Sequence, residues 1–276
     1  MINPYLELII SALILSTSGA FIKIIKLPAT SISFYRFLIP VIITLAYFAY
    51  KKIKFLKDNN RVVLLASFMN AIRMFLYFVG FTYAPISVAA KIHYTWPVFA
   101  VIFSVMLLKE KLSRRNIFFI CLAFVGIMLI YLNKDFSLKS GLFVGMAAML
   151  LSAILNALAT VLFKRVGERY SRTELVFYQN IAGVLLFIPF IFINPVPTSY
   201  QFSLTVIYVV LIGIIGYWLF FSALKKIKAS TASFLAYLEL IGSVAIGVVF
   251  FGDKLAFTTV VGAMLIIVST LLFKKN

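Results

Sequence analysis

Residues 81–112 read FTYAPISVAAKIHYTWPVFAVIFSVMLLKEKL, and residues 224–255 read LKKIKASTASFLAYLELIGSVAIGVVFFGDKL. The two stretches align without a gap when the chain is compared with itself at an offset of 143 residues. The matches at this offset include SVA at 87–89 with STA at 230–232, EKL at 110–112 with DKL at 253–255, and FY at 34–35 with FY at 177–178. Chance similarity between apolar helices is the alternative, but it does not account for three matches with polar residues at one offset. The sequence therefore predicts two copies of one structural unit.

The composition indicates an integral membrane protein. Of the 276 residues, 63% are hydrophobic and 12% are charged, and the mean hydropathy is +1.09. An average soluble domain is about half apolar and about a quarter charged, and no polar segment of this chain is long enough to form such a domain. Cys121 is the only cysteine and lies in an apolar run, which excludes a disulfide or a metal–thiolate site within one chain.

Ten apolar runs are long enough to cross a hydrocarbon core, which takes about 20 helical residues. The runs lie between charged or turn-rich breaks, at 5–22, 30–50, 61–83, 86–108, 114–132, 139–163, 173–193, 202–223, 230–251 and 256–273. We therefore predict an all-α polytopic membrane protein with ten transmembrane helices. Residues 1–8 carry no Lys or Arg, so we interpret the first run as a retained helix and not as a signal peptide.

The distribution of Lys and Arg predicts the orientation. With the N-terminus in the cytoplasm, 18 of the 26 basic residues lie in the inner loops and the C-terminal tail, and 5 lie in the outer loops. By the positive-inside rule, both termini are cytoplasmic. This topology and contact with anionic membrane lipids account for the net charge of +18. The basic residues are scattered over five short loops, so we expect no nucleic-acid partner.

Each predicted unit has five helices, an odd number, so the second unit must enter the membrane inverted relative to the first. The predicted repeats are residues 1–133 and residues 134–276. The EKL loop at 110–112 then lies inside, and its DKL copy at 253–255 lies outside. Inverted repeats of this kind form a binding site at their interface near the bilayer midplane, which opens alternately to each side.

Four segments carry a resemblance to a known family: ISFYRF at 32–37, FTYAPISVAA at 81–90, TWPVFAVIFSVMLLKEKLS at 95–113, and SALKKIKASTASFLAYLELIGSVAIGVVFFGDKL at 222–255. Together with the ten helices, they make the chain resemble the EamA type of the drug/metabolite transporter superfamily over essentially its full length. The resemblance implies an inner-membrane carrier with two inverted five-helix repeats, cytoplasmic termini and a central cavity. Members carry amino acids, nucleotide derivatives, sugars or drugs, so the substrate stays open. Many members have Glu-Pro in helix nine, where this chain has Glu239 followed by Leu240, so no proline kink is implied there.

Five ionisable residues lie within the predicted helices: Arg36, Arg73, Lys91, His93 and Glu239. A charge at the centre of a membrane helix costs roughly 2.5–3.5 kcal/mol on insertion scales, so such residues usually face a cavity or a partner. For Arg36 and Lys91, which lie nearer the outer helix ends, the alternative is that their long side chains reach the interface. For Arg73 and Glu239, which lie near the helix centres, the alternative is a buried ion pair that fixes helix packing.

Helix faces predict which residues line the cavity. Asn70, Arg73 and Tyr77 share one face by their spacing, and the KIHYTW stretch at 91–96 adds polar and aromatic residues. The predicted substrate-binding residues are Arg36, Asn70, Arg73, Tyr77, Lys91, His93, Tyr94, Trp96, Tyr178 and Glu239. Further candidates for the lining are Asn156, Asn180, Tyr217 and Trp218. Trp218 fits an interfacial aromatic belt better.

The charges of this site predict the class of substrate. With His93 neutral, three cations face one acid, and this excess of positive charge favours a zwitterionic or anionic metabolite, such as an amino acid or a nucleoside-containing metabolite. Arg73 is the expected partner of its carboxylate. The alternative, an exporter of hydrophobic or cationic drugs, requires a cation to enter a cavity of like charge.

Glu239 and His93 are the candidates for proton coupling. Burial disfavours a charged Glu239, whereas a nearby Arg73 favours it, and the sequence gives no distance that decides between the two effects. Exchange or facilitated diffusion would need neither residue.

Two other classes of protein fit less well. A membrane-embedded lipid-modifying enzyme needs a carboxylate cluster or a nucleophile with its base, and Glu239 is the only acidic residue in a helix interior. A structural subunit without a cavity does not require an inverted repeat. We therefore expect a monomeric transporter of the cell inner membrane that is not an enzyme and has no catalytic residues, cofactor or metal.

Overall fold

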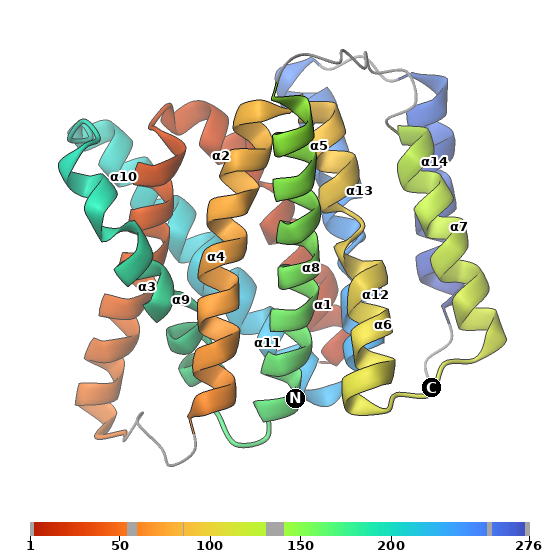
Figure 1. The fold of residues 1–276 in the computed structure, drawn as a ribbon, viewed down its shortest axis with the longest axis horizontal. Helices are drawn as coiled ribbons and strands as arrows, with labels where there is room; N and C mark the ends of the chain where they lie inside the picture. Colours follow the sequence, from red (N-terminus) through yellow and green to blue (C-terminus); the bar gives the residue numbers. More distant parts are fainter. Residues whose placement is uncertain (1–2, 54–59, 85, 131–140, 253–255, 274–276) are drawn as a thin grey trace.

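The computed structural model describes residues 3–53, 60–84, 86–130, 141–252 and 256–273, without the side chains of a few helical residues, Lys91 among them. Every regular element in these ranges is a helix, and Figure 1 shows the helices standing side by side as a bundle. Seven helical segments are long and apolar enough to cross a membrane, and two apolar helices are shorter, Trp96–Leu108 and Phe257–Thr270. The prediction of an all-α polytopic membrane protein is confirmed.

The described helices cover the ten predicted runs, five of which are divided into consecutive shorter elements. The first half contains α1 (Pro4–Ser16), α2 (Ser18–Ile25), α3 (Ala29–Lys51), α4 (Arg61–Tyr83), α5 (Ile86–His93), α6 (Trp96–Leu108) and α7 (Arg114–Ile130). The second half contains α8 (Leu142–Val166), α9 (Arg172–Phe187), η1 (Ile188–Phe192), α10 (Ser199–Tyr208), η2 (Val209–Gly216), α11 (Tyr217–Lys226), α12 (Ala229–Leu235), α13 (Leu238–Phe251) and α14 (Phe257–Leu272).

The first predicted run divides at Thr17, between α1 and α2. Two consecutive hydroxyls turn back onto the preceding turn there: Ser16 Oγ donates to the carbonyl of Leu13 at 2.7 Å, and Thr17 Oγ1 donates to that of Ile14 at 2.7 Å. Side chains that bond to backbone carbonyls in this way offer an alternative to the regular helix and bend it.

Two further breaks overlap at the offset of 143 residues, at Tyr94 and Tyr237. The helix of run 86–108 is interrupted at Tyr94 and Thr95, and the helix of run 230–251 is interrupted at Ala236 and Tyr237. Pro97 accounts for the first break, because proline donates no backbone hydrogen bond and its ring disfavours a continuous helix. Nothing in the local sequence explains the second, which lies without a proline just before Glu239.

The eighth predicted run contains a π-helix, η2, between α10 and α11. This wider helix packs closely on α1, because Ser11 Oγ donates to the carbonyl of Gly216 at 2.8 Å. A Cβ on Gly216 would lie 3.3 Å from side-chain atoms of both Ile14 and Leu15. The glycine therefore permits the close approach of the two helices, and Tyr217 follows directly after it.

The core lies between the two halves. Helix α4 packs along α8 and α9, α3 along α9, α6 along α8 and α12, and α1 along α11 and α13. The rings of Phe37 and Phe187 stack across the α3–α9 contact with centroids 5.6 Å apart. At one end of the α1–α11 contact, Lys226 Nζ forms an ion pair with the buried Glu7 at 2.9 Å.

Helices α7 and α14 form a pair that depends on glycine. A Cβ on Gly126 would lie 2.6 Å from the carbonyl oxygen of Gly262. We expect Gly126→Ala to lower stability by about 1–3 kcal/mol, because the backbone of α14 must shift to admit the methyl group. Thermal unfolding in detergent measures this. Gly19→Ala is the control, since no atom lies within 4 Å of its Cβ position, and equal unfolding temperatures for the two variants would contradict the expectation.

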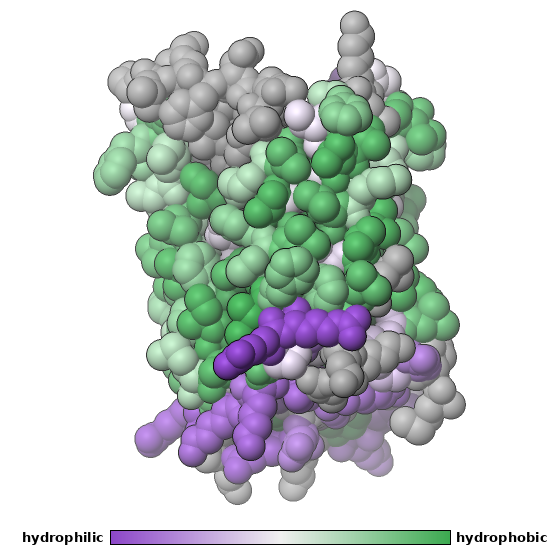
Figure 2. Space-filling model, turned by 90° about the vertical axis from the view of Figure 1, so that its right-hand side faces the viewer, coloured by the Kyte–Doolittle hydropathy of each residue, from purple (hydrophilic) through white to green (hydrophobic). Residues whose placement is uncertain are grey.

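The outer surface is apolar, as a lipid-facing surface must be. Phe143, Phe192 and Phe257 are 80%, 86% and 82% exposed. Figure 2 shows a broad band of hydrophobic residues on the face that carries α7 and α14, with hydrophilic residues gathered at one end of the molecule. The described residues thus divide into an apolar belt and a polar end.

Candidate functional site

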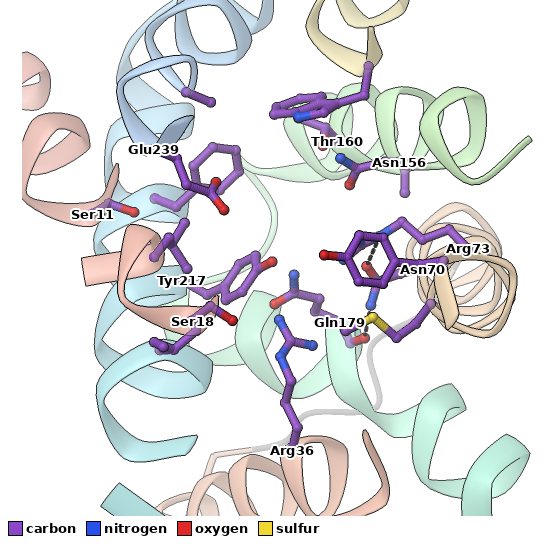
Figure 3. A pocket seen from close by; sticks show the side chains of 18 of the residues that line it. Ser11, Ser18, Arg36, Asn70, Arg73, Asn156, Thr160, Gln179, Tyr217 and Glu239 are labelled. Atoms are coloured by element: carbon purple, nitrogen blue, oxygen red, sulfur yellow. Dashed lines mark hydrogen bonds between the residues drawn. The ribbon is translucent and has the colours of Figure 1, made fainter. Parts of the chain in front are cut away.

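A cavity lies at the centre of the bundle and receives residues from both halves. The lining residues whose side chains carry a nitrogen or an oxygen atom are Ser11, Ser18, Ser33, Arg36, Asn70, Arg73, Tyr77, His93, Trp96, Asn156, Thr160, Gln179, Tyr208, Tyr217 and Glu239. Figure 3 shows the labelled members converging from different helices.

Arg36 extends from α3 into the cavity and not toward the membrane interface. Its side chain is buried, and the guanidinium carbon lies 5.2 Å from the centroid of the Tyr217 ring. Its Nη1 atom has no hydrogen-bond partner in the described part of the chain. The aromatic face stabilises the cation, but one strong donor remains available to a ligand.

Arg73 belongs to a hydrogen-bonded chain that links three helices. Its Nε donates to Asn70 Oδ1 at 3.0 Å, and Asn70 Nδ2 donates to the backbone carbonyl of Gln179 at 2.8 Å. Ser152 Oγ donates to the carbonyl of Arg73 at 2.7 Å. These bonds tie α4 to α9 on one side and to α8 on the other.

Glu239 lies in the first turn of α13, directly after the break that follows α12. A carboxylate is favoured at this position by the positive end of the helix dipole. Figure 3 shows Glu239 and Tyr217 directed into the cavity from the side opposite Arg73. In the described residues, neither Arg36 nor Arg73 forms an ion pair with Glu239 within 4.0 Å. The structure therefore does not contain the packing ion pair considered as an alternative for Arg73 and Glu239.

Aromatic side chains from the helices of the first half line another part of the cavity. The rings of Tyr77 and His93 meet edge to face with centroids 4.9 Å apart, and Trp96 is buried at the start of α6. His93 Nδ1 has no hydrogen-bond partner in the described residues. Faces and edges of such rings favour a planar group on the ligand.

Three predicted residues do not contribute described side chains to this cavity. Tyr94 contacts the His93 ring with centroids 5.6 Å apart and packs against the apolar cluster that contains Val101, Phe119 and Phe234. Tyr178 points away, because its hydroxyl donates to Asn60 Oδ1 at 3.4 Å. The side chain of Lys91 lies outside the described residues.

Of the four further candidates for the lining, two face the cavity and two do not. Asn156 and Tyr217 line the cavity. Asn180 does not, because its amide donates to the carbonyl of Val176 within its own helix. Trp218 lies under the guanidinium of Arg172, with the guanidinium carbon 4.0 Å from its ring centroid.

The most informative residue missing from the prediction is Gln179. Its neighbours Tyr178 and Asn180 were natural candidates by residue type, but Gln179 is the one that faces the cavity. The offset of 143 residues contains the signal, because it maps Arg36 onto Gln179 and Trp96 onto Glu239. Further lining pairs at this offset are Met74 with Tyr217, Tyr77 with Phe220, Phe78 with Phe221, and His93 with Ala236.

The fold and the cavity show the class of protein, which is a polytopic helical membrane protein with a central polar cavity. The chain belongs to the EamA-like transporter family, whose model matches residues 3–132 and 143–274. It is therefore a membrane transporter, and the resemblance seen in the sequence is confirmed. The family is described as one of transporters, in agreement with the expectation of a transporter for this chain.

Several known proteins are similar to the chain over most of its length. Solute carrier family 35 member G1 of Mus musculus is 25% identical, covering 95% of this chain and 75% of that protein. Pseudopaline exporter CntI of Pseudomonas aeruginosa is 22% identical, covering 91% and 87%. S-adenosylmethionine uptake transporter of Rickettsia prowazekii is 26% identical, covering 89% and 83%. A solved crystal structure shares the fold with a TM-score of 0.83 at 17% identity, covering 98% of this chain and 95% of that one.

Proposed function

We propose that the chain is a secondary transporter of the cell inner membrane that moves a small zwitterionic or anionic metabolite through the central cavity by alternating access. The observation that carries this proposal is the cavity itself, where Arg36, Arg73 and Glu239 converge inside the helical bundle. Charged groups at this depth are costly and are usually retained for a substrate or ion pathway.

Alternating access rests on the proposed inverted repeat of residues 1–133 and 134–276. Support comes from the helix breaks at Tyr94 and Tyr237, which are 143 residues apart, and from the lining pairs at the same offset. An even number of membrane crossings places both termini on one side, and the basic loops favour the cytoplasm for that side. In such carriers the two repeats rock about a site at their interface.

The charge of the cavity supports the substrate class. Among the described lining residues, Arg36 and Arg73 carry positive charge and Glu239 is the only acid. An acidic group on the substrate balances the arginines. S-adenosylmethionine, which gives the Rickettsia relative its name, carries both an amino-acid head group and a nucleoside. The aromatic lining at Tyr77, His93 and Trp96 suits such a nucleoside.

The alternative function is export of hydrophobic or cationic drugs. The aromatic lining favours it, whereas the two arginines oppose it, because a cation would face like charge in a medium of low dielectric constant. Proton coupling through Glu239 or His93 belongs to the proposal in either case, and exchange is its alternative.

A thermal-unfolding panel tests the proposed substrate class. The purified protein is heated with amino acids, nucleotides, S-adenosyl compounds, sugars and quaternary ammonium drugs in turn. A ligand at 100 times its dissociation constant stabilises by about 2.7 kcal/mol. We expect a carboxylate-bearing compound to raise the unfolding temperature and to enter proteoliposomes by counterflow. Stabilisation by cationic drugs alone would contradict the proposal.

A further inference from the structure

The two arginines of the cavity differ in how their hydrogen-bonding capacity is used. Arg73 Nε is committed to Asn70, which in turn donates to the backbone of α9. Arg36 Nη1 is buried and has no partner in the described residues. A buried guanidinium donor without an acceptor is unfavourable, so Arg36 Nη1 requires an acceptor from a ligand.

Two more unpartnered groups lie beside Arg36. Ser33 precedes it by one helical turn and therefore shares its face of α3. Gln179 occupies the position equivalent to Arg36 on α9, the helix that packs along α3. Ser33 and Gln179 both line the cavity. Ser33 Oγ and Gln179 Oε1 have no hydrogen-bond partner within the described ranges. Figure 3 shows Arg36 and Gln179 directed into the same part of the cavity.

The donor and acceptor chemistry of these groups is mixed. Arginine only donates, the amide oxygen of glutamine only accepts, and a serine hydroxyl does either. A group that satisfies all three must offer an acceptor and a donor next to each other. An α-amino-acid head group does so, because its carboxylate and its ammonium group are attached to the same carbon.

We infer that Arg36, Ser33 and Gln179 form the subsite for an α-amino-acid head group on the transported substrate. This inference rests on the proposed function and narrows its substrate class. The carboxylate accepts from Arg36 Nη1 and from Ser33, and the ammonium group donates to Gln179 Oε1. In this assignment Arg73 fixes the packing of α4 against α9 through its Nε, and Arg36 holds the head group.

The first test needs no ligand. Removing a buried donor that has no partner relieves an unfavourable group, whereas removing a bonded one leaves Asn70 unpaired. We expect Arg36→Gln and Gln179→Leu to unfold at or above the temperature of the unmodified protein, and Arg73→Gln to unfold roughly 4 °C or more below it. Arg165→Gln, at an exposed position, is the control. Lower stability of Arg36→Gln than of Arg73→Gln would overturn the assignment.

The second test uses three defined probe mixtures in the thermal assay: L-amino acids with S-adenosylhomocysteine, N-acetyl-L-amino acids, and L-amino acid methyl esters. We expect only the first mixture to stabilise the protein. Arg36→Gln and Gln179→Leu each weaken that binding at least about tenfold, which is the effect of one charge-assisted hydrogen bond. Arg73→Gln keeps the preference for the free amino acid over its N-acetyl derivative.

The outcomes separate this inference from the proposed function. If N-acetyl compounds bind as well as free amino acids, the head-group subsite is overturned while an anionic substrate stands. If no mixture stabilises the protein, the head-group subsite is likewise overturned, and the wider panel decides the proposed function. If only methyl esters bind, both the head-group subsite and the proposed substrate class are overturned.

Discussion

Replacing Glu239 with glutamine is expected to abolish uptake driven by a pH gradient and to leave counterflow exchange of the same substrate intact. Glu239 is the only acid among the described lining residues, and it faces Arg73 across the cavity. A glutamine keeps the size and polarity of the side chain but neither binds nor releases a proton. We expect accumulation to fall more than tenfold, to the level of passive equilibration.

Proteoliposomes with and without an inwardly directed proton gradient measure this difference. Glu168→Gln is the matched control, because Glu168 is exposed outside the cavity. His93→Gln tests the other candidate, whose Nδ1 has no hydrogen-bond partner in the described residues. If gradient-driven uptake survives in Glu239→Gln and is lost in His93→Gln, the histidine carries the proton. If it survives in both, exchange or facilitated diffusion replaces proton coupling.

Glu110→Ala is expected to lower stability and to open the cavity toward the side on which Glu110 lies. The Glu110 carboxylate accepts from the backbone N–H of Ala229 at 2.6 Å, from that of Ser230 at 3.1 Å, and from the Ser230 hydroxyl at 2.5 Å. It thereby caps α12 and joins the end of α6 to the second half of the chain. Hydrogen bonds to a charged group contribute roughly 1.5–3 kcal/mol each, and water replaces part of this on mutation, so we expect a loss of about 2–3 kcal/mol.

Two measurements check this expectation. Thermal unfolding gives the stability change, with Glu168→Ala as the control for loss of an exposed carboxylate. For access, Thr160→Cys is placed in a Cys121→Ser background, because Thr160 lines the cavity and Cys121 is exposed. A membrane-impermeant thiol reagent added on the side of Glu110 should label Thr160→Cys several-fold faster when Glu110→Ala is present. Unchanged labelling would show that the carboxylate stabilises the fold without closing the cavity.

The sequence predicts the helices well because a membrane imposes a simple length and polarity rule on each run. It does not predict where helices break. The break at Tyr94 has a local cause in Pro97, and the one at Thr17 follows two adjacent hydroxyls. The break at Tyr237 has no local signal. The sequence also does not show that Glu110, from a distant part of the chain, holds the start of α12. Tertiary contacts of this kind are invisible to a local pattern.

The sequence predicts only part of the candidate site, because it shows the charge and depth of a residue but not which way its side chain faces. Charge and depth identify Arg36, Arg73 and Glu239, since their cost in lipid is large. Uncharged polar residues cost less free energy in lipid, so the rotation of the helix decides which of them faces the cavity. Tyr178 and Gln179 are adjacent in sequence and point in different directions, and only Gln179 faces the cavity. Residue type alone favoured the tyrosine. Whether an arginine is free or bonded depends on contacts between helices, which no local sequence pattern reveals.

The π-helix before Tyr217 makes the site tolerant of a change in chain length. A π turn holds about one residue more than an α turn, and each residue of an α-helix advances by about 100°. Deleting one residue from η2 would let this stretch close into a regular α-helix without rotating the residues that follow it. Tyr217 would then stay in the cavity, and Lys226 would stay beside Glu7. The same deletion from α11 itself would turn every later side chain of that helix by about 100° and would separate Lys226 from Glu7.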